Sequence, residues 1–350
     1  MKNITIKSFR SDYEVSFKDA FQEMKKDVDN DAIFIVDRLV YKLYIDHLDF
    51  LDKSKVCLIH ASEKNKTMER AQDIIFSLIE MGAKRSTNLV AVGGGIIQDL
   101  TCFVASIMFR GISWKFYPTT LLAQCDSCIG SKSSINVGNF KNQVGTFYPP
   151  KQIVIDVNFL KTLECDQILS GLGEAIKVHY LDVDKRYHQI FDNYDLSLTD
   201  DDIMTEVVRN SLLIKRDVIE IDEFDTDYRN IMNYGHTFGH AIESITDYGV
   251  PHGIAVTLGM GVANYISMRM GFLDKDNYDM MKSLIDKNTS GFKFNIMGFE
   301  NQYWSALNKD KKNIDSNLVC ILTKGFGQMF KNKIPIDDNL KSLILDYSNS

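Results

Sequence analysis

Three short apolar runs near the start of the chain most constrain its fold. The runs "AIFIVD" (32–37), "KVCLIHA" (55–61) and "NLVAVGGG" (88–95) carry apolar residues at consecutive positions, which is typical of strands buried in a parallel sheet. Between the last two, "KTMERAQDIIFSLIEMGA" (66–83) has apolar residues at helical spacing. Strands that alternate with helices in this way predict a doubly wound α/β domain. Two later runs resemble further strands of this domain: "SWKFYPTT" (113–120) and "QIVIDV" (152–157).

The pattern changes after about residue 165. Segments such as "DDIMTEVVRNSLLIKRDVIEID" (201–222) and "GIAVTLGMGVANYISMRM" (253–270) are long and helix-periodic. We therefore predict an α/β domain over residues 1–165 and a mainly helical domain over residues 166–350. The cleft between two such domains is the default place for a binding site.

Composition excludes several classes of protein. The net charge of −7 argues against a general nucleic-acid or membrane-surface binder, which is usually basic. No apolar run approaches the roughly 18 residues that span a bilayer, and the N-terminus lacks the apolar core of a signal peptide. We therefore expect a cytoplasmic protein without a nucleic-acid or membrane partner. Six scattered cysteines predict reduced thiols, and the single C-x-x-C of Cys125 and Cys128 is weak evidence for a metal or redox role.

Three glycines directly follow the third predicted strand, in "AVGGGIIQD" (91–99). Glycine lets backbone amides approach a phosphate closely, but the spacing is not G-x-G-x-x-G, so a structural turn explains this stretch equally well. Asp37 ends the first strand, where a carboxylate could bind a ribose hydroxyl or cap a helix. Downstream, a polar, glycine-bearing stretch carries Asp126, Lys132, Lys141 and Asn142 close together. A lysine beside small residues, as Lys132 is, suits recognition of phosphate or carboxylate groups.

Histidines cluster in "NYGHTFGHAIES" (233–244), where His236 and His240 lie four residues apart, and His252 follows. That spacing puts the first two on one helix face, but no glutamate stands between them as it does in H-E-x-x-H. In "GLGEAIKVHY", Glu174 and Lys177 share a helix face, which an ordinary salt bridge would also explain. Three histidines and a glutamate nevertheless suit Zn²⁺.

Six motifs occur along the chain in one order: "GGGIIQDLTCFVAS", "FRG", "PTTLLAQCDS", "GEAIK", "NYGHTFGHAIES" and "HGIAVTLGM". Together they resemble the 3-dehydroquinate synthase family within the sugar phosphate cyclases, and the resemblance runs from Asp37 to about residue 313. It implies a Rossmann-like, NAD-binding parallel sheet in residues 1–165. It also implies a mainly α-helical, metal- and substrate-binding domain in residues 166–350.

The resemblance assigns site residues position by position. The implied metal ligands are Glu174, His236 and His252, with Zn²⁺ expected and Co²⁺ an alternative. The implied NAD⁺-binding positions are Asp37, Glu63, Lys66, Gly93, Gly94, Gly95, Ile96, Ile97, Gln98, Asp99, Thr119, Thr120, Lys132, Lys141, Phe159, Leu160, Lys161 and Thr162. The implied substrate-binding and catalytic positions are Asp126, Lys132, Asn142, Lys177, Lys215, Asp225, Arg229, Asn233, His240 and Lys311, with Lys312 adjacent to the last. Arg110, in "FRG", matches an arginine that reaches a neighbouring subunit's phosphate, which implies a homodimer.

The implied activity converts 3-deoxy-D-arabino-heptulosonate 7-phosphate to 3-dehydroquinate and phosphate, a lyase step of the shikimate pathway and of aromatic amino acid biosynthesis. In the family, NAD⁺ oxidises a ring hydroxyl, phosphate leaves by β-elimination, the ketone is reduced again, and an intramolecular aldol reaction closes the carbocycle. The resemblance implies that Lys132, Asn142, His240 and Lys311 hold the phosphate, and that Lys215 and Arg229 hold a carboxylate.

The sequence departs from the family pattern at a few positions. They are Gln98 in the glycine turn, Ser131 and Ser133 around Lys132, Phe140 before the Lys-Asn pair, and Asp225 in place of a glutamate. Together they leave open a cyclase for another sugar phosphate, such as sedoheptulose 7-phosphate. A metal- and NAD-dependent polyol dehydrogenase and a catalytically silent binding module are further alternatives.

Overall fold

The computed structural model describes residues 2–28, 31–138, 140–184, 186–308 and 317–349. The chain divides into two compact units. The first comprises Met1–Leu163 together with Lys215–Phe224, and the second comprises Glu164–Ile214 together with Asp225–Ser350.

The segment Lys215–Phe224 belongs to the first unit, although the sequence analysis grouped it with residues 166–350. Its acidic side chains explain this placement. The Glu223 carboxylate accepts hydrogen bonds from the Ser8 hydroxyl (2.6 Å) and the Phe9 amide (2.8 Å). Helical periodicity could not show that Lys215–Phe224 belongs to the first unit. It indicates which face of a helix is apolar, but not which part of the chain covers that face.

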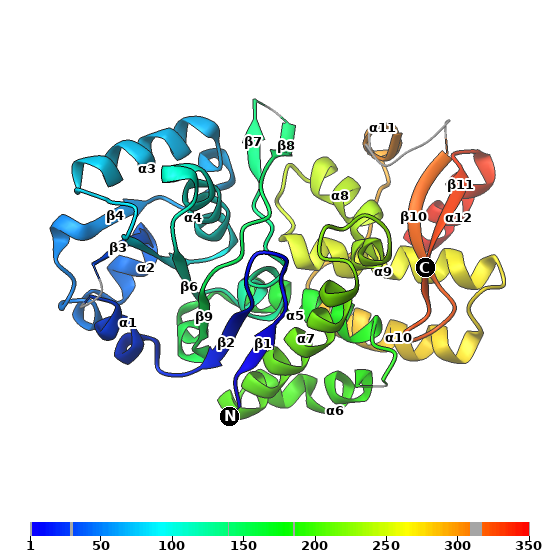
Figure 1. The fold of residues 1–350 in the computed structure, drawn as a ribbon. Helices are drawn as coiled ribbons and strands as arrows, with labels where there is room; N and C mark the ends of the chain where they lie inside the picture. Colours follow the sequence, from blue (N-terminus) through cyan, green and yellow to red (C-terminus); the bar gives the residue numbers. More distant parts are fainter. Residues whose placement is uncertain (1, 29–30, 139, 185, 309–316, 350) are drawn as a thin grey trace. The chain divides into compact units, whose positions relative to one another are not determined.

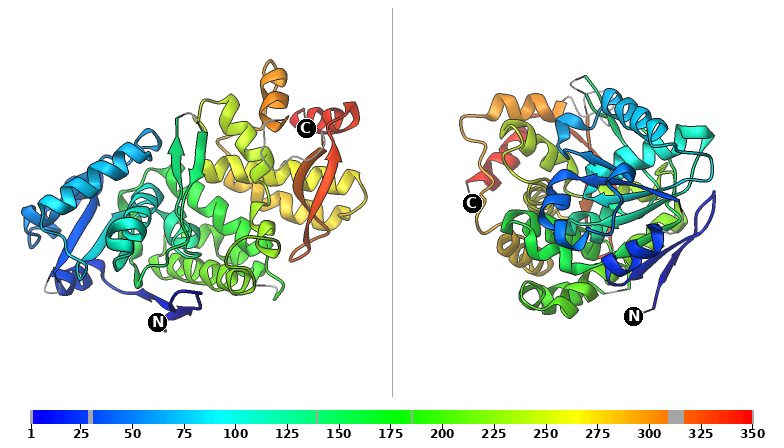
Figure 2. Two further views of the ribbon diagram at one scale, coloured as in Figure 1. Left: turned by 45° about the horizontal axis from the view of Figure 1, so that its top comes forward. Right: turned by 90° about the vertical axis from the view of Figure 1, so that its left-hand side faces the viewer.

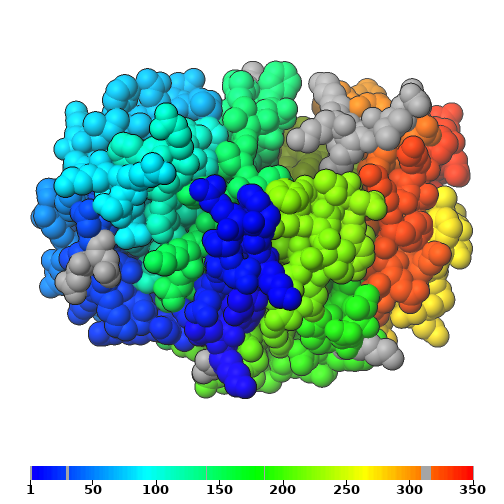
Figure 3. Space-filling model, in the orientation of Figure 1, coloured from blue at the N-terminus to red at the C-terminus, as the bar shows by residue number. Residues whose placement is uncertain are grey.

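A seven-stranded sheet forms the centre of the first unit, in the order β1-β2-β9-β6-β5-β3-β4. All neighbours are parallel except the antiparallel pair β1–β2. The strands are β1 (Ile4–Ile6), β2 (Tyr13–Phe17), β3 (Ala32–Asp37), β4 (Val56–Ile59), β5 (Asn88–Gly93), β6 (Trp114–Pro118) and β9 (Gln152–Ile155). The predicted parallel α/β architecture is confirmed. Figure 3 shows the β1–β2 pair, in dark blue, on the surface of the unit.

Helices cover both faces of this sheet. Ala20 and Met24 of α1 and Val40 of α2 pack with Phe34 and Val36 of β3 in one apolar cluster. Figure 1 shows α3 and α4 on the other side of the strands. The helices are α1 (Ala20–Val28), α2 (Arg38–Leu43), α3 (Met68–Glu80) and α4 (Gly95–Ile107). Because successive side chains of a strand point to opposite faces, strands covered on both sides must be apolar throughout, as the sequence runs are.

A small hairpin, β7 (Ile135–Val137) with β8 (Phe140–Val144), stands out from this unit in Figures 1 and 2. The side chain of Phe140, one of the departures from the family pattern, is 71% exposed on it.

The second unit is mainly helical, as predicted. Its helices are α5 (Cys165–Tyr180), α6 (Tyr187–Ser197), the first part of α7 (Asp201–Ile221), α8 (His236–Ile245), α9 (His252–Arg269), α10 (Lys275–Asn288), α11 (Glu300–Asn308) and α12 (Asp338–Ser348). Helix α9 is buried along almost its whole length and packs against α5, α8 and α10. An antiparallel hairpin, β10 (Asn317–Thr323) with β11 (Met329–Pro335), was not predicted. No helix in the described ranges combines the length and apolar character that a membrane span requires.

Candidate active site

Three predicted metal ligands lie together in the second unit. Glu174 comes from the middle of α5, and His236 and His252 are the first residues of α8 and α9. The Nε2 atom of His236 is 3.7 Å from Glu174 Oε1, and the Nε2 atom of His252 is 3.5 Å from the same oxygen. One ligand atom from each residue lies within 4.8 Å of the other two. Two imidazole nitrogens and a carboxylate oxygen at this spacing match a catalytic zinc set with an open fourth position.

Glycines explain why these three side chains meet. A Cβ atom on Gly253 would lie 1.8 Å from the Ser170 carbonyl oxygen, and one on Gly173 would lie 2.3 Å from the Gly253 carbonyl oxygen. The backbones of α5 and α9 therefore touch, and the neighbouring residues Glu174 and His252 are brought together. Only residues without a Cβ permit so close an approach.

The hydrogen bonds of the two rings orient them toward Glu174. His236 Nδ1 lies 3.2 Å from the Tyr234 carbonyl oxygen, and His252 Nδ1 lies 3.3 Å from Glu243 Oε1. A carbonyl and a carboxylate only accept hydrogen bonds, so each ring donates through its Nδ1–H, and its Nε2 atom faces Glu174, where it could bind a metal ion. This tautomer is the one that metal-binding histidines use when their other nitrogen is anchored.

The carboxylates of Glu174 and Glu243 favour a positive charge at His252, and the charge of Lys177 opposes it. Lys177 Nζ lies 2.5 Å from Glu174 Oε2, so the second oxygen of that carboxylate is already paired. Burial lowers the pKa of His252, but the hydrogen bond to Glu243 and the negative charges of Glu174 and Glu243 outweigh it, and the pKa lies above its ordinary value. A metal ion would compete with that proton for the same electrostatic environment.

Of the other predicted substrate residues in the second unit, His240 lies beside the three ligands. The rings of His236 and His240 are 5.4 Å apart, and those of His240 and His252 are 5.9 Å apart. Arg229 is buried in the short helix η7 (Tyr228–Asn233), which ends at Asn233. Asp225 lies outside both groups of possible metal ligands found among the described residues.

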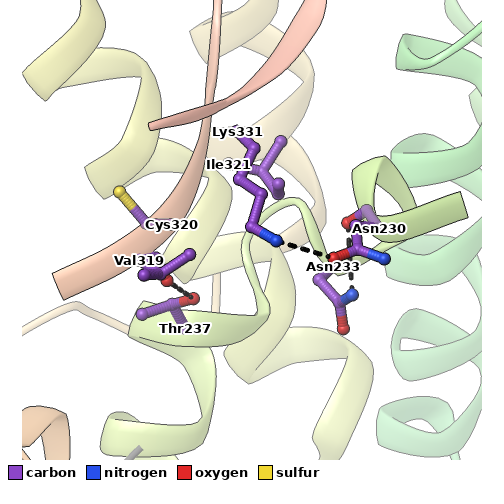
Figure 4. Close-up of a pocket in the computed structure, with 7 residues that line it drawn as sticks. All are labelled: Asn230, Asn233, Thr237, Val319, Cys320, Ile321 and Lys331. Carbon is purple, nitrogen blue, oxygen red and sulfur yellow. Dashed lines mark hydrogen bonds between the residues drawn. The ribbon is translucent and has the colours of Figure 1, made fainter. Parts of the chain in front are cut away.

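A cavity of about 30 Å³ adjoins Asn233 and is large enough for a water molecule (Figure 4). The Asn233 amide donates to the Asn230 carbonyl oxygen (3.1 Å), and Lys331 Nζ donates to Asn230 Oδ1 (3.2 Å). Lys331, on β11, is a charged neighbour of Asn233 that the sequence analysis missed, because no motif marks it.

In the first unit, the glycine turn joins β5 directly to α4. Gly93 ends the strand and α4 begins at Gly95. A Cβ on Gly93 would lie 2.5 Å from the Ile97 Cγ1 atom, so the turn needs glycine there. The result is a helix N-terminus with exposed backbone amides at the carboxyl end of a parallel strand, which suits a phosphate group.

The unusual Gln98 in this turn is accommodated locally. Its amide donates to the Ser127 carbonyl oxygen (2.6 Å), and its Oε1 accepts from the Ser127 hydroxyl (2.7 Å). Ser127 ends the π-helical turn η5 (Ala123–Ser127), so the longer side chain ties α4 to that turn.

A polar network gathers further predicted cofactor residues around Lys66. Its Nζ atom lies 3.1 Å from Asp99 Oδ2, 3.6 Å from Glu63 Oε1 and 2.8 Å from Asn142 Oδ1. Burial raises the pKa of Asp99, against the lowering effect of Lys66. Asn142, which the resemblance assigns to the substrate phosphate, thus lies with the predicted NAD⁺ positions in this structure.

Two members of this network, Asn136 and Ser134, were not predicted from the sequence. The Asn136 amide donates to Glu63 Oε1 (2.8 Å), and the Ser134 hydroxyl donates to Asp99 Oδ2 (2.9 Å). In the sequence they lie in the short, mostly polar stretch "KSSIN" (132–136), and such stretches are too common to predict a site.

Lys215 and Asp126 form a pair within the first unit. Lys215 Nζ lies 2.6 Å from Asp126 Oδ1 and also 2.6 Å from the Asp126 carbonyl oxygen. Nearby, Ser131 adopts a left-handed backbone conformation (φ 64°), and its hydroxyl donates to Glu223 Oε1 (3.0 Å). This bond supports a serine at a position where the family pattern has glycine.

The remaining predicted positions are distributed as follows. Asp37 caps α2 by accepting from the Leu39 amide (3.0 Å), so its helix-capping role is realised. Phe159, Leu160, Lys161 and Thr162 lie in η6 (Val157–Thr162). Thr119 and Thr120 follow β6, and Lys141 is on β8. The Nζ atom of Lys132 lies 6.0 Å from the centre of the Phe147 ring. Arg110 follows α4 and is exposed. Lys311 and Lys312 lie outside the described residues.

Cys125 and Cys128 lie outside both groups of possible metal ligands found among the described residues. Cys125 and Cys128 are buried thiols, and burial raises the pKa of Cys128 to about 12. A thiol that resists ionisation is a poor metal ligand or nucleophile, so the surroundings of Cys128 favour neither role.

Comparison with protein families gives two matches that together cover most of the chain. The family model described as 3-dehydroquinate synthase N-terminal matches residues 56–170, and the one described as 3-dehydroquinate synthase C-terminal matches residues 171–313. The 3-dehydroquinate synthase of Clostridium tetani is 37% identical over 329 residues, which is 93% of this chain and 87% of the relative. That of Helicobacter pylori (strain HPAG1) is 36% identical over 336 residues, or 94% and 96% of the two chains.

Solved structures confirm the predicted fold. A 2-deoxy-scyllo-inosose synthase complexed with carbaglucose-6-phosphate, NAD⁺ and Co²⁺ superposes with a TM-score of 0.87 at 24% identity, covering 99% of this chain and 100% of the other. A 2-epi-5-epi-valiolone synthase from Streptomyces hygroscopicus, with NAD⁺ and Zn²⁺ bound, superposes with a TM-score of 0.85 at 21% identity, covering 96% of this chain and 97% of the other. A sulfoacetaldehyde reductase from Bifidobacterium kashiwanohense superposes with a TM-score of 0.66 at 12% identity, covering 96% of this chain and 97% of the other.

Proposed function

The chain belongs to the 3-dehydroquinate synthase family, and we propose that it converts 3-deoxy-D-arabino-heptulosonate 7-phosphate to 3-dehydroquinate and phosphate. The observation that carries this proposal is the oriented set of Glu174, His236 and His252. Its geometry supports a divalent cation, and the relatives that share most of the chain's length carry the name of this activity.

The residues present fit both groups that the reaction needs. Two anchored imidazoles and a buried carboxylate suit Zn²⁺ or Co²⁺, and the glycine turn before α4 suits the pyrophosphate of NAD⁺. When bound, NAD⁺ supplies a hydride acceptor that is regenerated within the cycle, and the metal supplies a Lewis acid for the substrate oxygen.

The chain's own side chains bind and orient the substrate. Two buried cations, Lys215 and Arg229, are assigned to the substrate's carboxylate because they match the family positions with that role. His240, whose ring lies beside those of His236 and His252, is assigned to the phosphate. Between His236 and His240 the chain offers no carboxylate base, so we propose that the substrate's own phosphate accepts the proton removed before elimination.

Two of the departures from the family pattern are accommodated by local hydrogen bonds. Gln98 is held by Ser127, and Ser131 is held by Glu223, so both replacements are balanced by neighbours in the same unit. Neither replacement alters Lys215 or Arg229, the two positions that we assign to the substrate's carboxylate.

We also propose a homodimer in which Arg110 reaches the partner's site. The side chain of Arg110 is exposed, as such a role requires. Light scattering of the purified protein tests this assembly.

Substrate profiling tests the proposed activity. The protein, loaded with Zn²⁺ and NAD⁺, is incubated with the heptulosonate 7-phosphate or with sedoheptulose 7-phosphate, and phosphate release is measured. We expect release from the heptulosonate only. Release from sedoheptulose 7-phosphate alone would establish the alternative cyclase, and accumulation of NADH with a simple polyol would establish a dehydrogenase.

A further inference from the structure

We propose that Glu243 is the positioning residue of the metal centre: its carboxylate holds the Nδ1–H of His252 so that Nε2 faces Glu174. This inference rests on the proposed function, because it requires a metal ion at Glu174, His236 and His252. No motif or resemblance assigned Glu243 a role.

Helix geometry places Glu243 within reach of His252. It stands seven residues after His236 on α8, which is about two helical turns, so both side chains leave the helix on the same face. The side chain of Glu243 is 12% exposed, and its Oε1 atom lies 3.3 Å from His252 Nδ1. A mostly buried carboxylate beside an imidazole is a strong, directional acceptor for the ring N–H.

His252 needs such an anchor more than His236 does. The side chain of His252 is 37% exposed, against 14% for His236, so packing restrains its ring less. His252 is also the first residue of α9, and the preceding cap residue, Pro251, makes no side-chain cap hydrogen bond. The anchor of His236 is the backbone carbonyl of Tyr234, which no substitution removes. Glu243 is therefore the anchor that mutation can test.

A competing arrangement makes Glu243 a ligand. Single ligand atoms of His240, Glu243 and His252 also lie within 4.8 Å of one another. The buried set around Glu174 uses the Nε2 atoms and leaves the Glu243–His252 hydrogen bond intact, so we favour the positioning role.

Titration of the metal-free, full-length protein with Co²⁺ tests the inference, with affinity, stoichiometry and the visible absorption bands as readouts. The variants are Glu243→Ala and Glu243→Gln, with Ser244→Ala as the matched control, because Ser244 is the next residue on α8 and is exposed. We expect Glu243→Ala to weaken Co²⁺ binding by about 10–100-fold and to change the absorption bands. Glu243→Gln keeps an oxygen that accepts from Nδ1–H and should recover most of the affinity, while Ser244→Ala should match the wild type.

Two further readouts separate positioning from a general structural role. The Nδ1–H resonance of His252 in ¹⁵N-edited NMR should be lost in Glu243→Ala, while the unfolding temperature of the metal-free variant stays near that of the wild type. Wild-type affinity and absorption bands in Glu243→Ala would overturn the inference. So would two Co²⁺ ions per wild-type chain that fall to one in this variant, because Glu243 would then be a ligand. A wild-type protein that binds no Co²⁺ or Zn²⁺ would instead refute the metal centre of the proposed function itself.

Discussion

Lys177 Nζ lies 2.5 Å from Glu174 Oε2, and both side chains are almost completely buried. Glu174 thus offers one oxygen to a lysine and the other to two histidines, so its charge is shared between a permanent cation and the proposed metal. Removing one partner of such a pair leaves a buried charge without compensation.

Lys177→Met should therefore lower the free energy of unfolding of the metal-free protein by about 3–5 kcal/mol. Excess Zn²⁺ should reduce this deficit, because a second cation beside Glu174 replaces the missing charge. Denaturant unfolding with and without Zn²⁺ measures both effects. An equal deficit in the two conditions would contradict a metal ion at Glu174.

Alanine substitutions of the two histidines of α8, His236 and His240, should have different effects on metal binding and on KM. His236→Ala removes a proposed ligand and should abolish stoichiometric Zn²⁺ and activity together. His240→Ala should retain Zn²⁺ and raise KM for the phosphorylated substrate, because its ring lies beside the ligands without belonging to the set around Glu174. Metal analysis and steady-state kinetics check this division of roles, which loss of zinc from His240→Ala would refute.

The close approach of α5 and α9 gives a steric prediction. A Cβ on Gly253 would meet the Ser170 carbonyl oxygen at 1.8 Å, so Gly253→Ala must push the two backbones apart. We expect a loss of at least about 1–3 kcal/mol in unfolding free energy, the usual cost of overpacking, and weaker metal binding because Glu174 and His252 separate. Gly291→Ala is the matched control, since no atom lies within 4 Å of its added Cβ. Equal stability of the two variants would show that this contact does not control the site.

His179 should make stability depend on pH. It is fully buried in α5, and burial lowers its pKa to about 4 from an ordinary value of 6.5. Because the folded pKa lies below the unfolded one, the unfolded chain binds the proton first. Stability is then full above about pH 6.5 and falls as the pH drops toward 4, by up to about 3 kcal/mol.

The variant His179→Leu removes this titration and should flatten the dependence of the unfolding free energy on pH between 6.5 and 4. Urea unfolding across this range measures the two slopes. If the unfolding free energy of the variant and of the wild type changed equally with pH, His179 would be ruled out as the cause of the pH dependence.

The sequence predicted the fold well where burial leaves a periodic signal. The apolar runs of β3 and β5 are buried on both faces, and this alone indicated a parallel sheet. The hairpin β10–β11 was missed although "NLVCILT" is an apolar run, because it lies within a region dominated by helical periodicity. The return of Lys215–Phe224 to the first unit depends on contacts between residues far apart in sequence, which no local pattern reveals.

The site was predicted from motifs more than from spacing. His236 and His240 at helical spacing favoured a pair of ligands, whereas the family motifs singled out Glu174, His236 and His252, which the structure brings together. Asn136 bonds to Glu63, 73 residues away, so only the folded chain could reveal that contact. Glu243 and His252 both lie within the quoted motifs, but the motifs do not show that the two side chains meet.

The most direct test of the account counts products in one reaction. Protein loaded with Zn²⁺ and NAD⁺ is mixed with 3-deoxy-D-arabino-heptulosonate 7-phosphate, and phosphate, 3-dehydroquinate and NADH are measured together. The account predicts phosphate and 3-dehydroquinate in equal amounts over many turnovers, no net NADH, and neither product from His236→Ala. Phosphate without the carbocycle, or NADH that rises with turnover, would contradict it.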